Sequence, residues 1–239
     1  MFLTICQQAK QKQVQARRTH NTGTEHAGKQ VATRFGESIG ADHIIFGRAC
    51  AGVNNETVCL VLRDSATNVA ECCPSRSKGT EESESAYRHF TDLDNARELR
   101  SDNSPEEIAV AKNCGLRHKT ARPYRPQSHA TDERFNQTVL SDGRTYLLQS
   151  GLDVSYWPYA LRYAAFVHNV CPHLGVEHTP WFALHNKEFA GALIPFGSEV
   201  FVAVAPEYRD QSRPRESAAC IPWMLYAATR DMVWRVLNC

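Results

Sequence analysis

Short runs of β-branched and aliphatic residues alternate with polar turn signals in the first third of the chain. We predict strands over 42–47 (DHIIFG), 57–64 (TVCLVLRD) and 69–73 (VAECC), the first two separated by the Gly/Asn-rich turn AGVNNE. Three strands at this spacing predict an antiparallel meander at the start of a sheet.

Helical periodicity starts after the third predicted strand. We expect Thr80 to be the N-cap of a helix with an acidic first turn, and Asn103 or Ser104 to cap a helix that begins at Pro105. The other predicted elements, in chain order, are a strand over 97–102, a strand from 117, and helices over 131–149 and 156–169.

This order of elements predicts an α/β fold, with a mixed five-stranded sheet flanked by helices, over residues 39–189. Residues 1–38 are polar, Gln-rich and basic, which is typical of a solvated arm. Residues 190–239 are expected to form a C-terminal extension with a short strand and irregular structure.

Composition narrows the class of protein. The chain has 239 residues, 42% of them hydrophobic, but no apolar run approaches the roughly 18 residues that a membrane helix needs. Its nine cysteines are scattered, which favours reduced thiols inside a cell over a disulfide scaffold. The net charge of +1 does not by itself indicate a nucleic-acid partner.

Three carboxylates are placed where they could carry chemistry. Asp42 lies in the first predicted strand, Asp102 at the end of the fourth, and Glu133 in the first turn of the long helix. If the first and fourth strands are neighbours, the two aspartates meet and a helix packed across them can deliver the glutamate. Converging carboxylates suit Mg²⁺ or Mn²⁺, and two such ions about 4 Å apart could support phosphoryl transfer.

Each of these acids also has a purely structural interpretation. Asp42 can simply flank a strand, Asp102 can turn the chain, and Glu133 can complement the helix dipole. In a chain with 26 acidic residues, spacing alone does not decide between the two interpretations.

The segment Arg100–Val139 resembles the catalytic core of retroviral and retrotransposon integrases, most closely the copia-type LTR retrotransposons. The likeness rests on a strand that ends in Ser-Asp-Asn and on the loop PYRPQ, which leads to a helix carrying Glu133-Arg134. Flanking segments extend it over about residues 38–205, including ADHIIFG, LLQSGLDVSYWPYALRYAAFVHNV and HTPWFALHNKEFAGALIPFGSEVFV.

This resemblance implies an RNase H-like fold and a metal-binding triad of Asp42, Asp102 and Glu133. It implies DNA integration, through 3′-end processing and strand transfer by a polynucleotidyl transferase or endonuclease with two Mg²⁺ or Mn²⁺ ions. The expected partners are DNA and further copies of the chain, with no membrane and no small-molecule substrate. The chain is then expected in the nucleus or cytoplasm, as a piece of a longer Pol polyprotein.

Basic and polar residues around the predicted catalytic loop are candidates for DNA contacts. Cations there would bind phosphates, although ordinary surface charge is the alternative interpretation. The candidates are Lys119, Arg122, Arg125 and Arg134 for the backbone, with Gln127 and Asn136 helping to position it.

The chain also departs from the integrase pattern. Only 30 residues separate Asp102 from Glu133, the loop before Glu133 is His-Ala-Thr-Asp, and Asp64 is a rival for the first acid. Of the N-terminal zinc module, Cys6 alone matches a ligand, so we expect no zinc and interpret residues 1–38 as a remnant. Two alternatives follow: a degenerate remnant that only binds nucleic acid, and a nuclease of the same fold that acts on RNA–DNA hybrid.

Overall fold

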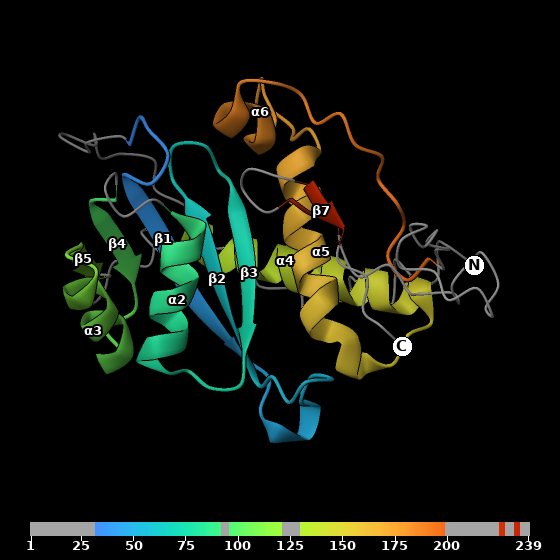
Figure 1. Ribbon diagram of the computed structural model, residues 1–239, viewed down its shortest axis with the longest axis horizontal. Helices are drawn as coiled ribbons and strands as arrows, with labels where there is room; N and C mark the ends of the chain where they lie inside the picture. The colour runs from blue at the N-terminus through green and yellow to red at the C-terminus, as the bar shows by residue number, and fades with distance from the viewer. Residues whose placement is uncertain (1–31, 92–95, 121–129, 199–224, 228–231, 235–239) are drawn as a thin grey trace, which may run out of the picture.

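A five-stranded mixed sheet forms the centre of the protein, as seen in a computed structural model that describes residues 32–91, 96–120, 130–198, 225–227 and 232–234 (Figure 1). The strand order is β3-β2-β1-β4-β5, in which β1, β2 and β3 are antiparallel and β4 and β5 run parallel to β1. The predicted mixed sheet and meander are therefore confirmed. The strands are β1 (Ser38–Ile45), β2 (Val58–Asp64), β3 (Ala70–Ser75), β4 (Glu98–Ser101) and β5 (Arg117–Thr120).

All four predicted helices are present, and the structure also contains shorter elements that we did not predict from the sequence. The predicted helices are α2 (Thr80–Phe90), α3 (Pro105–Asn113), α4 (Ala130–Ser150) and α5 (Trp157–Val170). The unpredicted elements are the helix α6 (Pro180–His185), the 3₁₀ turns η1 (Arg48–Cys50) and η3 (Val154–Tyr156), and the strand pair β6 (Leu225–Ala227) and β7 (Met232–Trp234).

Helix starts agree with the sequence signals at one of the two predicted caps. Ser104 is the N-cap of α3, with Pro105 in the first turn, where a missing N–H costs nothing. Thr80, the predicted cap of α2, is instead its first helical residue, because Gly79 has the extended conformation of the cap. A Cβ on Gly79 would lie 2.1 Å from a carboxylate oxygen of Glu82, so glycine lets the acidic first turn fold back over the cap.

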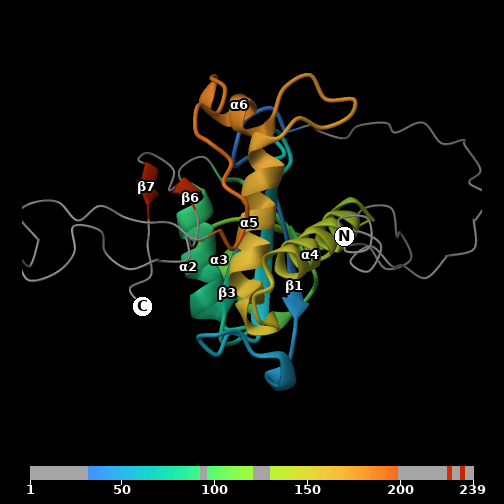
Figure 2. The ribbon, with the colours of Figure 1, turned by 90° about the vertical axis from the view of Figure 1, so that its right-hand side faces the viewer.

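The two faces of the sheet bury separate cores. Figure 2 shows α2 and α3 on one side of the sheet and α4 on the other. The α2/α3 side buries Ile39, Leu62 and Leu99, which are all fully buried, around Tyr87 of α2. The opposite side packs Val61 and its neighbours against α4 and α5. Because strand side chains alternate, neighbouring residues of β1 contribute to opposite cores.

Several predictions fall outside the described residues. Most of the expected basic arm, most of the Pro-rich loop expected over 123–131 and the strand expected near residue 200 lie there. Within the described part of the chain, no helix is both long and apolar enough to cross a membrane. The proposed domain limits at 39 and 189 remain predictions.

Candidate carboxylate site

Asp42 and Asp102 lie level with each other on neighbouring parallel strands. In the β1–β4 ladder Ser38 is opposite Glu98 and Gly40 is opposite Arg100, a constant offset of 60 residues. Continuing that register places Asp42 beside Asp102, which directly follows β4. Asp42 is the fifth residue of β1, so the expectation that it begins the strand was wrong.

Both aspartates lie on the α4 side of the sheet. Leu99 is in the α2/α3 core, so alternation directs Arg100 and Asp102 to the other face. Asp42 is held there directly, because the side-chain amide of Asn136 in α4 donates a hydrogen bond of 2.7 Å to its Oδ2. The backbone N–H of His43 donates to the other carboxylate oxygen, at 2.8 Å.

A glycine in β1 allows α4 to lie close to this edge of the site. A Cβ on Gly40 would lie 3.0 Å from both carboxylate oxygens of Asp132, in the first turn of α4. Asp132 is largely buried and also lies 3.9 Å from the guanidinium of Arg100. The first turn of α4 therefore passes over Gly40 and the second over Asp42, through Asn136.

Asp102 has a charged partner from a distant part of the chain. The Nζ of Lys78, in the connection between β3 and α2, lies 3.3 Å from its Oδ2, and the backbone N–H of Ser104 donates to its Oδ1 at 3.2 Å. Partial burial raises the pKa of Asp102, but the hydrogen bonds of Ser104 and the ammonium of Lys78 outweigh it. The net pKa of Asp102 is below its ordinary value, so the carboxylate is ionised at neutral pH.

Glu133 is exposed on the first turn of α4, as predicted. It precedes Asn136 by three residues, and side chains at this spacing are neighbours on a helix. Glu133 therefore lies one turn from the contact that α4 makes with Asp42. Even so, no three His, Cys, Asp or Glu side chains among the described residues are gathered closely enough to hold a metal ion. The structure brings the two aspartates together, but it does not close a three-carboxylate pocket.

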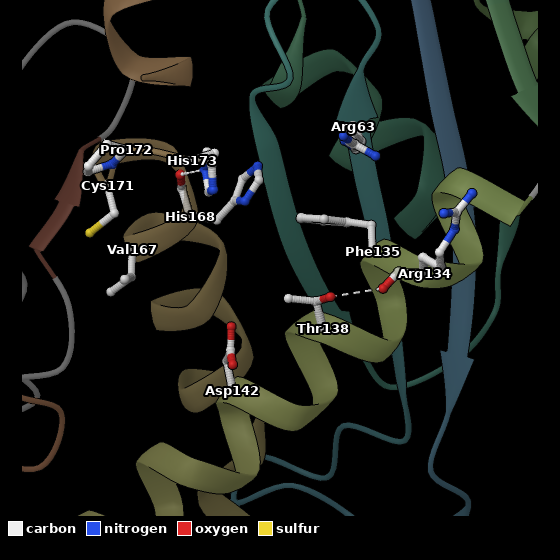
Figure 3. A pocket seen from close by; sticks show the side chains of 10 residues that line it. All are labelled: Arg63, Arg134, Phe135, Thr138, Asp142, Val167, His168, Cys171, Pro172 and His173. Carbon is white, nitrogen blue, oxygen red and sulfur yellow. Dashed lines mark hydrogen bonds between the residues drawn. The ribbon is translucent and has the colours of Figure 1, made fainter. Parts of the chain in front are cut away.

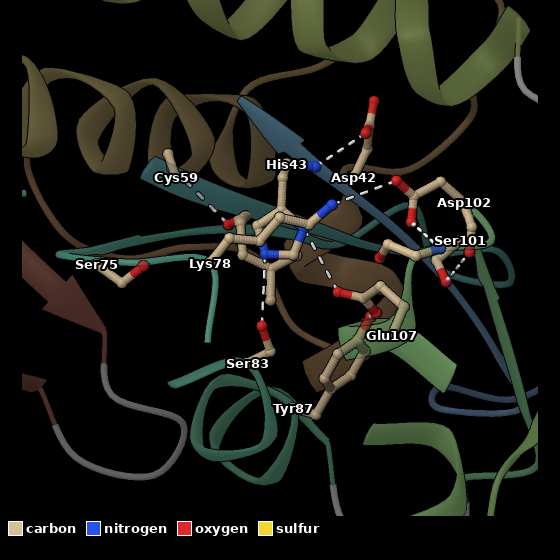
Figure 4. Close-up of polar contacts among 12 residues, drawn as sticks. Asp42, His43, Cys59, Ser75, Lys78, Ser83, Tyr87, Ser101, Asp102 and Glu107 are labelled. Carbon is tan, nitrogen blue, oxygen red and sulfur yellow. Dashed lines mark hydrogen bonds and ion pairs between the residues drawn. The ribbon is translucent and has the colours of Figure 1, made fainter. Parts of the chain in front are cut away.

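A buried polar cluster lies beneath the two aspartates, on the α2/α3 side (Figure 4). The Nδ1 of His43 lies 3.5 Å from Oε1 of Glu107, and the hydroxyl of Tyr87 donates to Oε2 of Glu107 at 3.0 Å. Burial lowers the pKa of His43 to about 4 and raises that of Glu107 to about 7. Sequence reasoning missed this cluster, although alternation along β1 places the neighbour of Asp42 on the opposite face.

Asp64, the rival for the first carboxylate, has a structural role. Its side chain is fully buried at the end of β2, where it pairs with Ile39 near the start of β1. Its oxygens accept hydrogen bonds from the backbone of Gly36, Ala66 and Thr67, at 2.7–3.0 Å, and from the Thr67 hydroxyl. Asp64 thus stabilises the β2–β3 turn, away from Asp42.

The candidate DNA contacts are only partly described. Lys119 lies on β5 with its side chain 58% exposed, and its Nζ is 3.2 Å from Glu98. Arg134 is exposed next to Glu133, and Asn136 is the residue that contacts Asp42. The remaining candidates, Arg122, Arg125 and Gln127, lie outside the described residues.

A cavity of about 610 Å³ opens between α4 and the end of α5 (Figure 3). Arg63, Phe135 and Asp142 line it, and the Arg63 guanidinium lies 5.1 Å from the centre of the Phe135 ring. Across the cavity, the Nε2–H of His173 donates to the backbone carbonyl of His168 at 2.8 Å. This cavity lies on the α5 side of α4, whereas Asn136 contacts Asp42 on the β1 side, and Arg134, next to Glu133, also lines the cavity.

Comparison with known sequences supports a relation to transposon proteins. The chain is 28% identical over 127 residues to the retrovirus-related Pol polyprotein from transposon RE1 of Arabidopsis thaliana, covering 52% of this chain and 7% of that protein. It is 30% identical over 120 residues to the corresponding polyprotein from transposon TNT 1-94 of Nicotiana tabacum, covering 47% and 9%. The chain thus corresponds to less than a tenth of the length of these relatives. No protein family model matches it.

Comparison with solved structures addresses the fold. The chain matches one from the cryo-EM structure of a simian T-cell lymphotropic virus intasome in complex with PP2A regulatory subunit B56 gamma, with a TM-score of 0.53 and 17% identity. The match covers 86% of this chain and 74% of that chain. The predicted resemblance and the mixed α/β fold are confirmed: about half of the chain is similar to retrovirus-related Pol polyproteins of plant transposons, and the chain shares its fold with the matched chain of the viral intasome.

Proposed function

We propose that the chain is an integrase catalytic domain that carries out metal-dependent phosphoryl transfer on DNA, in 3′ processing and strand transfer for retrotransposon integration. One observation carries the proposal: Asp42 and Asp102 lie level on neighbouring parallel strands, and α4 is tied to Asp42 through Asn136. Glu133 is one turn away on the same helix. The relation to Pol polyproteins is consistent with this activity.

The donor set fits a hard divalent cation. Asp42, Asp102 and Glu133 offer carboxylate oxygens, the ligands that Mg²⁺ and Mn²⁺ prefer. When bound, such ions activate an attacking oxygen and stabilise the leaving oxygen of a phosphodiester. Among the chain's own groups, Asn136 orients the Asp42 carboxylate, and Ser104 orients that of Asp102. Glu133, exposed one turn before Asn136 on α4, is the third proposed ligand.

DNA is the proposed partner, together with further copies of the chain. Arg134 neighbours Glu133, and Lys119 is the penultimate residue of β5, the strand that leads into the 121–129 segment, so both border the proposed site. A cation in this position binds phosphates without reading the sequence of bases. The site would therefore recognise the DNA backbone.

Strand transfer on a short DNA duplex with Mn²⁺ tests the proposal. Asp102→Asn keeps the size of the side chain but removes the charge, so it should abolish both 3′ processing and strand transfer. Glu177→Gln is the matched control, because its carboxylate is 89% exposed and distant in sequence from the site; it should have wild-type activity. Equal activity of wild type and Asp102→Asn would refute the proposal. Preference for an RNA–DNA hybrid over duplex DNA would instead favour the related nuclease.

A second candidate is a remnant that binds nucleic acid without catalysis. It is favoured by the absence of a gathered three-acid group among the described residues and by the short interval of 30 residues between Asp102 and Glu133. A Mn²⁺ titration separates the two candidates. A competent triad should lose affinity sharply in Glu133→Gln, whereas a remnant should bind Mn²⁺ equally weakly with and without this carboxylate.

A further inference from the structure

Lys78 is the charged residue that the structure adds to the carboxylate site. Its Nζ lies 3.3 Å from Asp102, and its side chain is only 24% exposed, compared with 58% for Lys119. An exposed lysine is held loosely, since ordering its long side chain costs conformational entropy. Partial burial of Lys78 therefore indicates that its position is determined by the site.

The connection that carries Lys78 is fixed on the N-terminal side of the lysine. Arg76 donates from Nε to the carbonyl of Asn54 at 3.1 Å, and its own carbonyl accepts from the hydroxyl of Thr57 at 2.8 Å. The hydroxyl of Ser77 donates to Glu82 in α2, also at 2.8 Å. The two residues before the lysine are thus tied to the segment that precedes β2 and to α2, and this arrangement presents the ammonium at the carboxyl ends of β1 and β4.

The charge of Lys78 also acts on the residues beneath the site. It lowers the pKa of His43, after the larger effect of burial, and it opposes the burial that raises the pKa of Glu107. The ammonium is therefore close enough to influence groups on the α2/α3 side of the sheet as well as Asp102. A divalent ion that binds Asp102 would therefore have to compete with the ammonium of Lys78.

We propose that Lys78 is a built-in counter-cation of the carboxylate site, which neutralises Asp102 until a divalent ion binds and then contacts a phosphate oxygen of the DNA backbone. This inference rests on the proposed function. Like charges about 4 Å apart repel, and even partial solvent screening leaves a penalty that corresponds to roughly tenfold in affinity. Once displaced from Asp102, the ammonium is a point charge of the kind that binds phosphate.

The proposal makes predictions of opposite sign for one substitution. Lys78→Met removes the competing charge, so it should tighten Mn²⁺ binding about fivefold to tenfold in the absence of DNA. The same substitution removes the phosphate contact, so strand transfer at saturating Mn²⁺ should fall at least about tenfold. A purely structural lysine would weaken both properties together.

The experiment combines a Mn²⁺ titration of the full chain, followed by electron paramagnetic resonance, with single-turnover strand transfer. Lys78→Arg keeps the charge and should remain within about threefold of wild type in both assays, and Lys78→Gln serves if the methionine variant fails to fold. Lys112→Met is the matched control, an exposed lysine at the end of α3 that should match wild type. Near-ultraviolet circular dichroism checks that each variant is folded.

The outcomes separate this inference from the proposed function. Unchanged or weaker Mn²⁺ binding by Lys78→Met, with binding lost in Asp102→Asn, overturns the counter-cation role and leaves the integrase proposal intact. Tighter Mn²⁺ binding with undiminished strand transfer overturns the phosphate contact. Absence of Mn²⁺ binding in wild type, Lys78→Met and Lys78→Gln alike overturns both proposals.

Discussion

Asp64 lies opposite the start of β1 and Asp42 lies further along that strand, and the two aspartates have different surroundings. Asp64, opposite Ile39 near the start of the strand, is fully buried and accepts four hydrogen bonds at 3.0 Å or less, three of them from Ala66 and Thr67 in its own turn. Asp42, further along β1, is partly exposed and accepts a hydrogen bond from Asn136, 94 residues away. It also lies level with a second aspartate.

The difference separates a structural carboxylate from one with a proposed function. A carboxylate saturated by donors of its own turn satisfies the local backbone, and its oxygens are unavailable to a ligand. Asp42 is held in place by a distant helix and lies beside Asp102, an arrangement whose repulsion has no benefit for folding. Such an arrangement is typical of a site that binds a cation.

The largest expected effect is on catalysis at the Asp42 end. Asp42→Asn removes a proposed metal ligand, so strand transfer should fall by at least about 1000-fold, which corresponds to several kcal/mol of transition-state stabilisation. The free energy of unfolding should change by less than about 1 kcal/mol, because the site is partly exposed and the amide oxygen can still accept one of the two hydrogen bonds, from Asn136 or from the His43 N–H. Single-turnover assays and urea unfolding measure the two quantities, and activity within tenfold of wild type would contradict the assignment.

The reverse pattern is expected at the other end. In Asp64→Asn an amide N–H₂ replaces one oxygen and faces backbone donors, so buried N–H groups lose their acceptor. The free energy of unfolding should fall by about 3 kcal/mol. The folded fraction should retain strand transfer within about threefold of wild type, measured below the unfolding temperature. If the Asp64→Asn variant is stable but inactive, the catalytic role belongs to Asp64 and its assignment to Asp42 is wrong.

Glu107, on the side of the sheet below Asp42, should make the stability of the protein depend on pH. Burial raises its pKa from 4.5 to about 7, so the folded protein holds a proton that the unfolded chain has lost between these pH values. The free energy of unfolding therefore falls as the pH rises from about 4.5 through about 7. Glu107→Gln cannot titrate, so its stability relative to wild type should rise by up to about 3 kcal/mol between pH 4.5 and pH 8.

Urea unfolding at pH 4.5 and pH 8 measures this difference. Tyr87 acts on Glu107 through a hydrogen bond, and Asp102, Lys78 and Glu106 act through their charges, with His43 in direct contact. Burial of His43 makes stability rise with pH between about 4 and 6.5, but this contribution is common to both proteins. If the stability of Glu107→Gln relative to wild type is the same at pH 4.5 and at pH 8, Glu107 is ionised in the folded protein at both pH values.

Sequence reasoning identified the elements better than the contacts between them. The strands, the long helices and the positions of Asp102 and Glu133 at element ends follow from local periodicity and turn chemistry. The contacts of Asp42 with Asn136 and of Asp102 with Lys78 join residues 94 and 24 positions apart, and they depend on strand order and helix docking. The short helix α6 was missed because its six residues are fewer than two turns, too few to show a periodicity.

Gly40 gives the smallest and most local test of the comparison. An added Cβ would lie 3.0 Å from the Asp132 carboxylate, so Gly40→Ala should move the first turn of α4 by a few tenths of an ångström. We expect a loss of about 1 kcal/mol in the free energy of unfolding. Glu133 lies on the same turn, so strand transfer should fall by up to about tenfold, because small misplacements of reacting groups are costly.

Asp132→Ser in the same chain shortens the side chain that the methyl group meets. If the spacing between β1 and α4 positions Glu133, this second substitution should restore activity. A double variant that is no more active than Gly40→Ala would show that the spacing does not position Glu133.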